Sequence, residues 1–245
     1  MPDNAPVVLV TGSARRIGAA ICTHLHAHGF RVAMHGLSSG DALQALAEQA
    51  NARRPGSAIA LHADLLDADA PQRLVDACLQ HFGRLDALVN NASNFFPTPV
   101  GEATPRQWDE LFAVNARAPF FLMQAAAPHL RERHGAVVNL TDLHADRPRR
   151  DYPVYSAAKA ALAMLTQAMA LELAPEVRVN AIAPGAILWP QPEPSEAARQ
   201  ALLARTPLAR IGTVEEVAEA VRWLLQDASY VTGHTLALDG GRRLT

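Results

Sequence analysis

The chain alternates short apolar runs with longer segments in which apolar residues recur every three or four positions. Short apolar runs bounded by turn residues predict strands, and the periodic segments predict amphipathic helices. The predicted strands are residues 7–10, 31–35, 58–61, 85–90, 136–140, 177–182 and 235–238. The predicted helices are residues 17–28, 42–52, 71–81, 105–130, 154–173, 195–205 and 214–225.

The predicted strands are almost wholly apolar, as in the run VVLV at residues 7–10. Strands of this kind are buried on both faces, which a parallel sheet covered by helices on each side requires. We therefore expect an α/β fold with one doubly wound, Rossmann-type parallel sheet of about seven strands. No repeat, charge block or linker interrupts the pattern, so residues 1–245 are expected to form a single domain. Closely spaced prolines loosen it at about 184–207, where we expect a mobile substrate lid.

Composition excludes several classes of protein. With 49% apolar and 19% charged residues, the chain is too hydrophobic to remain disordered. A net charge of −2 provides no basic field for nucleic acid or for an anionic membrane. The longest stretch without a charged residue, 87–101, is shorter than a membrane-spanning helix, and the N-terminus lacks a basic segment, so a cytoplasmic protein is expected.

Metal-ligating residues do not fall into a metal-binding pattern. Cys22 and Cys78 are far apart and form no paired motif, so both are expected to be small buried fillers. His24, His26 and His28 alternate along a predicted helix, where residues two apart diverge by about 200°, so the three cannot share one face. No metal site is expected.

The first predicted strand leads into a glycine-containing turn, Thr11 to Gly18, and then into a helix. In this context, glycines such as Gly12 let backbone N–H groups meet a pyrophosphate at a helix N-terminus. Two glycines alone are also compatible with an ordinary strand-to-helix turn, so this stretch by itself leaves both interpretations open.

The residues after the second predicted strand bear on which dinucleotide would bind there. NAD-binding Rossmann domains place an acidic residue at this point against the ribose 2′-hydroxyl, whereas this chain has none between His35 and Ser39. The side chains that could donate to a 2′-phosphate instead are Arg15, Arg16, His35 and Ser38. The pattern favours NADP(H), with a solvated first helical turn as the alternative for the two arginines.

Tyr155 and Lys159 lie four residues apart in a predicted helix, so both project from one face. Lys159 is the only lysine beside 21 arginines. Codon bias explains why lysine is scarce but not why this one remains. A phenol is a poor acid-base catalyst at neutral pH, and a nearby ammonium favours its ionised form. Lowering the tyrosine pKa from about 10 to about 7 takes about 4 kcal/mol of differential interaction.

Several motifs together have the order and spacing of a known family. They are Asn90-Asn91-Ala92, Asn115, Tyr155 with Lys159, Asn180, Pro184-Gly185 and Asp239-Gly240-Gly241. In this combination the chain resembles the short-chain dehydrogenase/reductases over essentially its whole length. The resemblance implies a homotetramer in which the long helices 105–130 and 154–173 pack against neighbouring subunits.

Two positions depart from the general family pattern. Arg16 stands where the fingerprint TGxxxGxG has its middle glycine, and Asp142 stands where most members have serine, thirteen residues before Tyr155. Together with the segment Asn91 to Pro99, and with the C-terminal run Asp239 to Leu244, these residues resemble the pteridine reductases and the related dihydromonapterin reductases.

The resemblance implies a role for each matching residue. The implied cofactor-binding residues are Gly12, Arg15, Arg16, Ile17, Gly18, His35, Ser38, Asp64, Leu65, Asn91, Ala92, Ser93, Tyr155, Lys159, Pro184 and Gly185. The implied substrate-binding residues are Arg16, Ser93, Phe95, Asp142, Tyr155 and Trp189, with Phe95 stacked on a pterin opposite the nicotinamide. The implied catalytic residues are Asp142, Tyr155, Lys159 and Asn115.

Some of these residues have a structural alternative. Phe95 and, more strongly, Phe96 could simply pack beneath the lid. Asp64 could cap the next helix instead of lying near adenine. Trp189 could either close the pocket or only stiffen the lid. The turn that contains Arg147, Arg149, Arg150 and Asp151 is expected to be solvated.

The implied reaction is hydride transfer from NADPH to carbon of a pterin C=N bond, with protonation of the adjacent nitrogen through Tyr155. Lys159 would anchor the nicotinamide ribose and lower the pKa of Tyr155, and Asn115 would hold a water of the proton relay. A carboxylate at Asp142 would repel the oxyanion of a carbonyl substrate but suits a pterin, which offers ring donors. The alternatives are a carbonyl or 3-oxoacyl reductase, and an NADP(H)-binding protein without catalysis.

Overall fold

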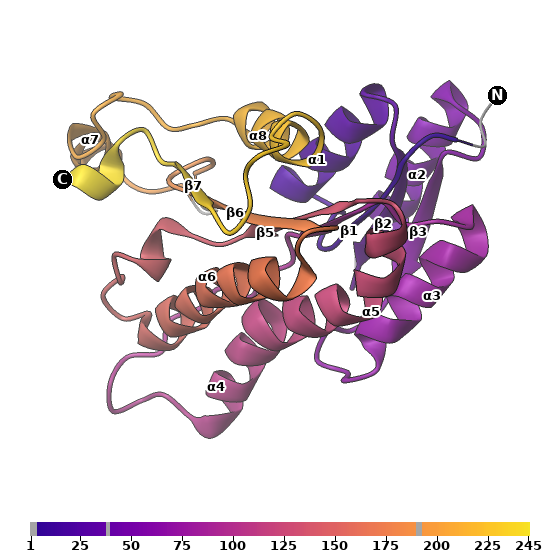
Figure 1. Cartoon of the computed structure of the whole chain (residues 1–245). Coiled ribbons are helices and arrows are strands. Elements are labelled where there is room, and N and C mark those ends of the chain that lie inside the picture. The colour runs from indigo at the N-terminus through magenta and orange to yellow at the C-terminus, as the bar shows by residue number, and fades with distance from the viewer. Residues whose placement is uncertain (1–3, 38–39, 190–192) are drawn as a thin grey trace.

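Seven parallel strands form one sheet in the order β3-β2-β1-β4-β5-β6-β7 (Figure 1). The computed structural model describes residues 4–37, 40–189 and 193–245. The strands are β1 (Val7–Val10), β2 (Arg31–Gly36), β3 (Ala58–His62), β4 (Ala87–Asn90), β5 (Ala136–Leu140), β6 (Arg178–Pro184) and β7 (Thr235–Leu238). The predicted doubly wound α/β fold is confirmed.

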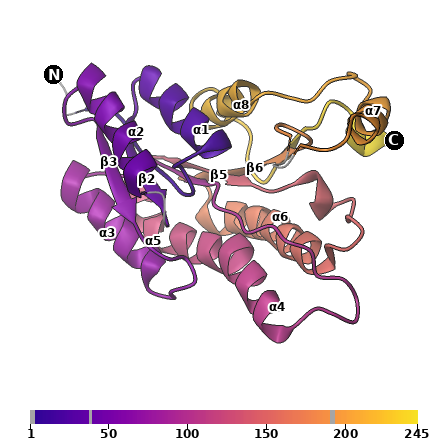
Figure 2. The same cartoon turned by 180° about the vertical axis from the view of Figure 1, so that it is seen from behind.

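Helices cover both faces of this sheet (Figures 1 and 2). The α-helices are α1 (Arg16–Ala27), α2 (Gly40–Arg53), α3 (Ala70–Phe82), α4 (Pro105–Phe112), α5 (Ala118–Glu132), α6 (Pro153–Leu173), α7 (Glu196–Ala204) and α8 (Val214–Gln226). Helices α1, α2 and α8 pack on one face, and α3, α5 and α6 pack on the other. Short 3₁₀ helices that the sequence did not predict, η2 (Leu143–Ala145) and η3 (Arg242–Leu244), complete the described elements.

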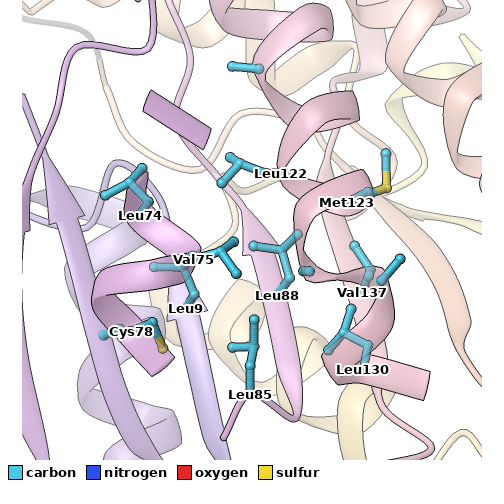
Figure 3. Packing of buried hydrophobic residues seen from close by; sticks show 14 of the residues in the cluster. Leu9, Leu74, Val75, Cys78, Leu85, Leu88, Leu122, Met123, Leu130 and Val137 are labelled. Carbon is cyan, nitrogen blue, oxygen red and sulfur yellow. The ribbon is translucent and has the colours of Figure 1, made fainter. Parts of the chain in front are cut away.

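Each face of the sheet has its own hydrophobic core, which explains why the strands are apolar at every position. Val7 and Leu9 of β1 point into the core beneath α3 and α5, whereas Val8 and Val10 point into the core beneath α1 and α8. Figure 3 shows the first of these cores, with Leu9 and Leu88 of the sheet facing the two helices. Both cysteines are free and buried, as expected of fillers.

The order of the strands reverses at β1, which determines where ligands can bind. Val8 of β1 lies opposite Val32 of β2 on one side and Ala87 of β4 on the other. The chain therefore leaves β1 and β4 toward opposite layers, and a crevice opens at the carboxyl ends of these two strands.

The helix predicted over residues 105–130 is interrupted, so this prediction was wrong in its continuity. Between α4 and α5, residues Ala113–Arg117 form a π-helical turn, η1, with Asn115 at its centre. Pro119 has no N–H group, so it cannot donate the α-helical hydrogen bond to the carbonyl of Asn115, four residues earlier. Turns of this kind often mark functional sites.

Helix α6 is the one helix in the described residues that is long and apolar enough to cross a membrane by length and composition alone. Half of the apolar window is buried inside the molecule. One side of the helix packs on the core that holds Met169 and Leu173. The core position of α6 accounts for its composition.

Candidate active site

Two connected cavities lie at the carboxyl edge of the sheet, along the β1–β4 crevice. The smaller, about 490 Å³, lies between the ends of β1, β2, β3 and β4, and the larger, about 680 Å³, reaches from there past β5 and α6 to the segment before α7. Residues that line both cavities are Arg16, Ile17, Asn91 and Ser93. The other expected site residues in the smaller cavity are Gly12, Arg15, Gly18, His35, Asp64, Leu65 and Ala92. Those in the larger cavity are Phe95, Asp142, Tyr155, Pro184, Gly185 and Trp189.

The turn after β1 presses directly against the end of β4. Gly12 has a left-handed φ of +64°, and a Cβ atom on it would lie 2.7 Å from the Cα atom of Ala92. The side chain of Asn91 donates to the carbonyls of Thr11 (2.8 Å) and Gly12 (2.9 Å). A Cβ atom on Gly18 would overlap the carbonyl oxygen of Gly12. Both glycines are therefore required by close backbone contact.

Arg16 has a backbone conformation that glycine adopts far more readily than other residues. Its φ is +53°, a left-handed conformation that costs a side-chain-bearing residue about 1–2 kcal/mol. Its side chain is exposed at the first residue of α1, where it borders both cavities. Strain of this kind at a cavity edge is typical of a functional residue.

The N-terminus of α1 has the properties of a phosphate-binding site. Helices α4 and α8 begin with complete capping boxes at Thr104 and Thr213, whereas α1 has no side-chain cap and no acidic residue in its first turn. Its first N–H groups are thus left to a ligand, and the helix dipole adds positive potential there. The glycine contacts and this uncapped terminus fit the pyrophosphate of a dinucleotide.

His35 does not play the expected part of a donor to a 2′-phosphate. Its Nδ1 atom accepts from the backbone N–H of Gly12 (3.4 Å), and its Nε2 atom lies 3.1 Å from the carbonyl of Ala63. Burial lowers the pKa of His35. The ring is therefore a neutral brace between the glycine turn and the end of β3. The sequence could not distinguish this bracing role from a donor role, because Gly12 and Ala63 are both distant from His35 along the chain.

The other residues expected near the ribose and adenine fall around the smaller cavity. Asp64 accepts from the backbone N–H of Leu66 (2.9 Å) within its own turn. Helix α3 begins at Ala70 with Asp69 at its N-cap position, so the alternative of Asp64 as the cap is wrong. Ser38 lies outside the described residues.

Tyr155 and Asp142 form a direct pair in the larger cavity. The phenol donates to Oδ2 of Asp142 at 2.7 Å, while Oδ1 accepts from the backbone N–H of His144 at 2.8 Å. Asp142 thereby also caps η2, which fixes the orientation of its carboxylate. Tyr155 comes from α6 and Asp142 from the loop after β5, so the pair depends on the packing of α6 against this loop.

Lys159 lies behind this pair and not in either cavity. Only 2% of the residue is exposed, and Nζ donates to the carbonyl of Leu140 at 2.9 Å. Burial lowers the pKa of Lys159 to about 8. The ammonium lies 5.9 Å from the centre of the Tyr155 ring, so the two side chains share one face of α6 as predicted.

The lowering of the Tyr155 pKa by Lys159 stays a prediction, because the groups of the chain alone act in the other direction. Burial, followed by the charge of Asp142 and its hydrogen bond, raises the pKa of Tyr155 above its ordinary value. The phenol therefore holds its proton firmly toward Asp142. Sequence spacing predicted that Tyr155 and Lys159 share a helix face, but it gave no information on how strongly burial raises the pKa of Tyr155.

Asn115 is fully buried and braces the loop after β4. Its side chain donates to the carbonyls of Asn94 (2.9 Å) and Leu111 (3.0 Å) and accepts from Oγ of Ser93 (2.7 Å). The side chain is thus a positioning group for Ser93. The water that we expected Asn115 to hold stays a prediction, and the backbone carbonyl that Pro119 leaves without its α-helical donor is the atom suited to hold it.

Phe95 lines the larger cavity with 47% of its surface exposed. One face stacks on Tyr152 at 4.5 Å between ring centres, and Tyr155 meets Phe95 edge-on at 4.7 Å. The stack with Tyr152 covers one face of Phe95, and the side chain keeps exposed surface at the larger cavity. Phe96 packs against the cluster of Leu111 and Val154, as its structural alternative required.

Two arginines that the sequence analysis did not assign to the site also line the larger cavity. Arg149 comes from the turn expected to be solvated, and its guanidinium carbon lies 4.6 Å from the centre of the Tyr152 ring. Arg242 comes from η3 near the C-terminus. The repeated arginines 147, 149 and 150 gave no signal that singled out Arg149.

The expectation of no metal site missed one surface cluster. His24 and His28 are four residues apart and share a face of α1, and their ring nitrogens lie within 4.8 Å of each other and of a carboxylate oxygen of Glu219 on α8. Arg222 already donates to both carboxylate oxygens of Glu219, at 2.8 and 2.6 Å. The cluster borders neither cavity.

Comparisons with known proteins agree with this architecture. A family model described as Enoyl-(Acyl carrier protein) reductase matches residues 12–243. The chain is 38% identical to pteridine reductase 1 of Leishmania tarentolae over 98% of this chain and 97% of that protein. It is 37% identical to a putative ketoacyl reductase of granaticin polyketide synthesis in Streptomyces violaceoruber, over 98% and 97%. It is 34% identical to a 3-oxoacyl-[acyl-carrier-protein] reductase of Staphylococcus aureus, over 95% and 96%.

Replacing Gly18 by alanine should weaken dinucleotide binding by about tenfold or more, because the added methyl group would push the turn away from Asn91 and Gly12. Fluorescence titration with NADPH measures this affinity. Gly56→Ala is the control for general destabilisation, since its φ of +70° strains the substitution although a Cβ atom there meets nothing within 4 Å. Unchanged affinity in Gly18→Ala would show that the turn does not hold the dinucleotide.

Lys159 should make the stability of the protein depend on pH. Its folded-state pKa of about 8 lies below the ordinary 10.5, so the folded state binds fewer protons between these values and the unfolding free energy rises with pH. Relative to Lys159→Met, the wild type should gain about 2 kcal/mol from pH 7 to pH 9.5. Chemical denaturation of both proteins measures the difference, and parallel pH profiles would contradict the burial of a charged lysine.

Proposed function

Because the chain belongs to the short-chain dehydrogenase/reductase family of nicotinamide-dependent oxidoreductases, we propose that it is an NADPH-dependent reductase of pterins. The reaction would reduce a C=N bond of a dihydropterin or pterin. The similarity to a pteridine reductase across nearly the whole chain supports the proposal, and the pairing of Tyr155 with Asp142 is the observation that carries it.

A carboxylate that accepts a hydrogen bond from the phenol suits a nitrogen heterocycle better than a ketone. In a carbonyl reductase, a hydroxyl at this position donates to the substrate oxygen, and an ionised Asp142 would instead destabilise the oxyanion that develops. A pterin presents ring N–H and amino donors that the Asp142 carboxylate can accept. Phe95 lines the same cavity with about half of its surface exposed, so a planar ring bound there would stack on it.

The residues around the smaller cavity support NADPH as the cofactor. The uncapped N-terminus of α1 would hold the pyrophosphate, and Arg15 and Arg16 at that cavity would bind a 2′-phosphate. Neither Gly36 nor Leu37, at the end of β2, carries the carboxylate that an NAD-binding domain uses at this point. When bound, NADPH supplies the hydride that adds to the carbon of the C=N bond.

The chain would supply the proton that the adjacent nitrogen takes up. Tyr155 is protonated and points to Asp142, so a substrate nitrogen placed beside the pair can take the phenol proton. Lys159 stabilises the resulting tyrosinate from behind, and Asn115 keeps Ser93 in place at the junction of the two cavities. Proton transfer thus does not require an ionised Tyr155 at the start.

A 3-oxoacyl reductase is the second candidate, which the relatives from Streptomyces and Staphylococcus favour. These relatives match this chain over almost the same length, so overall similarity does not separate the two activities. Asp142 favours the pterin reductase, because the serine hydroxyl that would donate to a ketone oxygen is absent at this position.

Purified protein with NADPH should reduce dihydrobiopterin and leave an acetoacetyl thioester unchanged, as followed by loss of nicotinamide absorbance. Asp142→Ser should lower pterin turnover about 100-fold or more, with NADPH affinity within threefold. Asp146→Asn, an exposed acid at the end of η2, is the matched control. Turnover of the thioester alone would overturn the pterin assignment, and tight NADPH binding without any turnover would indicate a protein that has lost catalysis.

We also propose that the protein is a homotetramer that buries α4, α5 and α6 against neighbouring subunits. Large apolar side chains are exposed on these helices, among them Trp108, Phe121, Met164 and Leu171. Exposed apolar surface of this extent is typical of an interface between subunits.

Phe121→Glu, with Met164→Glu, should dissociate this assembly, because a charge at the centre of an apolar interface is left unpaired. Analytical ultracentrifugation measures the mass. Leu208→Glu, an exposed apolar residue away from these helices, is the control and should leave the tetramer intact. A wild-type protein that sediments as a monomer at micromolar concentration would refute the proposal.

A further inference from the structure

We propose that the substrate carries an anionic group, a carboxylate or a phosphate, on the end that points away from the reacting ring, and that Arg149 and Arg242 bind this group. The inference rests on the proposed pterin reductase activity and specifies its substrate class. Both arginines line the larger cavity, which also contains Asp142, Tyr155 and Phe95.

Arg149 is held in place by aromatic rings and not by a counter-ion. Its guanidinium carbon lies 4.6 Å from the centre of the Tyr152 ring and 5.6 Å from that of Phe95, and these two rings are stacked on each other. Among the described residues, its side chain has no hydrogen-bond or salt-bridge partner within the chain. A guanidinium that stacks through its face keeps its N–H donors free at the edge. Arg149 is therefore pre-positioned beside the ring that Phe95 would stack on.

Arg242 is brought to the cavity by the way the C-terminal segment is fastened. Asp239 accepts from the backbone N–H groups of Gly241 (2.9 Å) and Arg243 (2.8 Å), which shapes the turn into η3. Arg147 donates to the backbone oxygen of Thr245 (2.7 Å), so the segment is tied to the loop after η2. In Figure 1 the C-terminus accordingly lies beside α7, and Ala198 and Leu202 of this helix line the cavity.

Neither Arg149 nor Arg242 forms a salt bridge among the described residues, although two carboxylates lie near Arg242. Burial, followed by the charges of Arg205 and Arg149, lowers the pKa of Arg242, while the charges of Asp142 and Asp239 partly oppose this effect. Each of these two carboxylates uses both of its oxygens in hydrogen bonds to its own surroundings. Like charges placed together at a cavity are unfavourable until an anion binds, and guanidinium groups match carboxylate and phosphate geometry. The cavity is thus built for an anionic ligand at this end.

The test compares kcat/KM for three dihydropterins that differ only beyond the ring: dihydrobiopterin, which is neutral, dihydrofolate, which carries carboxylates, and a dihydropterin with a phosphorylated side chain. At least one anionic substrate should exceed the neutral one by about tenfold or more. Arg149→Leu and Arg242→Leu should each lower kcat/KM for the anionic substrate about tenfold or more, chiefly through KM, and leave dihydrobiopterin within threefold. Arg150→Leu, in the same turn but outside the cavity, is the matched control and should change neither.

The carboxylate and phosphate arms identify which anion the site takes. Equal kcat/KM for neutral and anionic substrates, or equal losses on both in the arginine variants, would overturn the inference while leaving pterin reduction intact. If no pterin is turned over, the proposed function fails, and calorimetric binding of dihydrofolate still decides this inference. Weaker binding in Arg149→Leu, by about tenfold, supports the anion site, and unchanged binding overturns it.

Discussion

The contact between the turn after β1 and the end of β4 is the constraint on which the rest of the site depends. Two strands that neighbour each other in the sheet send their chains to opposite layers, and Gly12 lets the turn after β1 meet the backbone of Ala92. Gly18 lets the start of α1 pack against the carbonyl of Gly12. The side chain of Asn91 then locks the turn. This contact fixes the start of α1, the position of Ser93 and the boundary that the two cavities share, so the cofactor and substrate regions are set by one close approach of backbone.

Burial affects the protonation of Lys159 and Tyr155 more than their pairing with other charged groups does. Lys159 is the largest fully buried side chain among the described residues. Its ammonium donates a hydrogen bond to the carbonyl of Leu140 and is attracted at longer range by the charge of Asp142. Tyr155 keeps its proton because burial and Asp142 both oppose the phenolate. The phenol of Tyr155 thus stays protonated, and behind it lies an ammonium whose positive charge is disfavoured by burial. Any negative charge that develops on Tyr155 during turnover would be met by an ammonium that is already desolvated.

The sequence predicted elements well where their signal was local. The strands at 7–10, 136–140 and 235–238 have the predicted limits, because each is an apolar run between polar or turn residues. The π-helical turn was missed although Pro119, four residues after Asn115, was visible as its cause. The residues that the site needs at the ends of β1, β4 and β5 were also found, since motif spacing places them at one edge of a parallel sheet.

The roles of His35, Arg149 and Arg242 could not be predicted, because each depends on residues that are distant in the sequence and meet only in the folded protein. The bracing role of His35 requires Gly12 and Ala63, and the role of Arg149 requires the Phe95–Tyr152 stack, all of which lie on different elements. Arg242 reaches the site through the turn that Asp239 shapes and the hydrogen bond from Arg147 to Thr245. Charge patterns along the chain describe neighbours in sequence, whereas these contacts join segments up to about a hundred residues apart.

The burial of Lys159 also determines how the protein responds to covalent chemistry. The single ε-amino group of the chain is 2% exposed, so no lysine is available at the surface to reagents that acylate amines. Lysine-directed cross-linking or fluorescent labelling would therefore leave the folded protein's side chains untouched. The same reagents would report the opening of α6 from β5, because a lysine label can form only after Lys159 has left the carbonyl of Leu140.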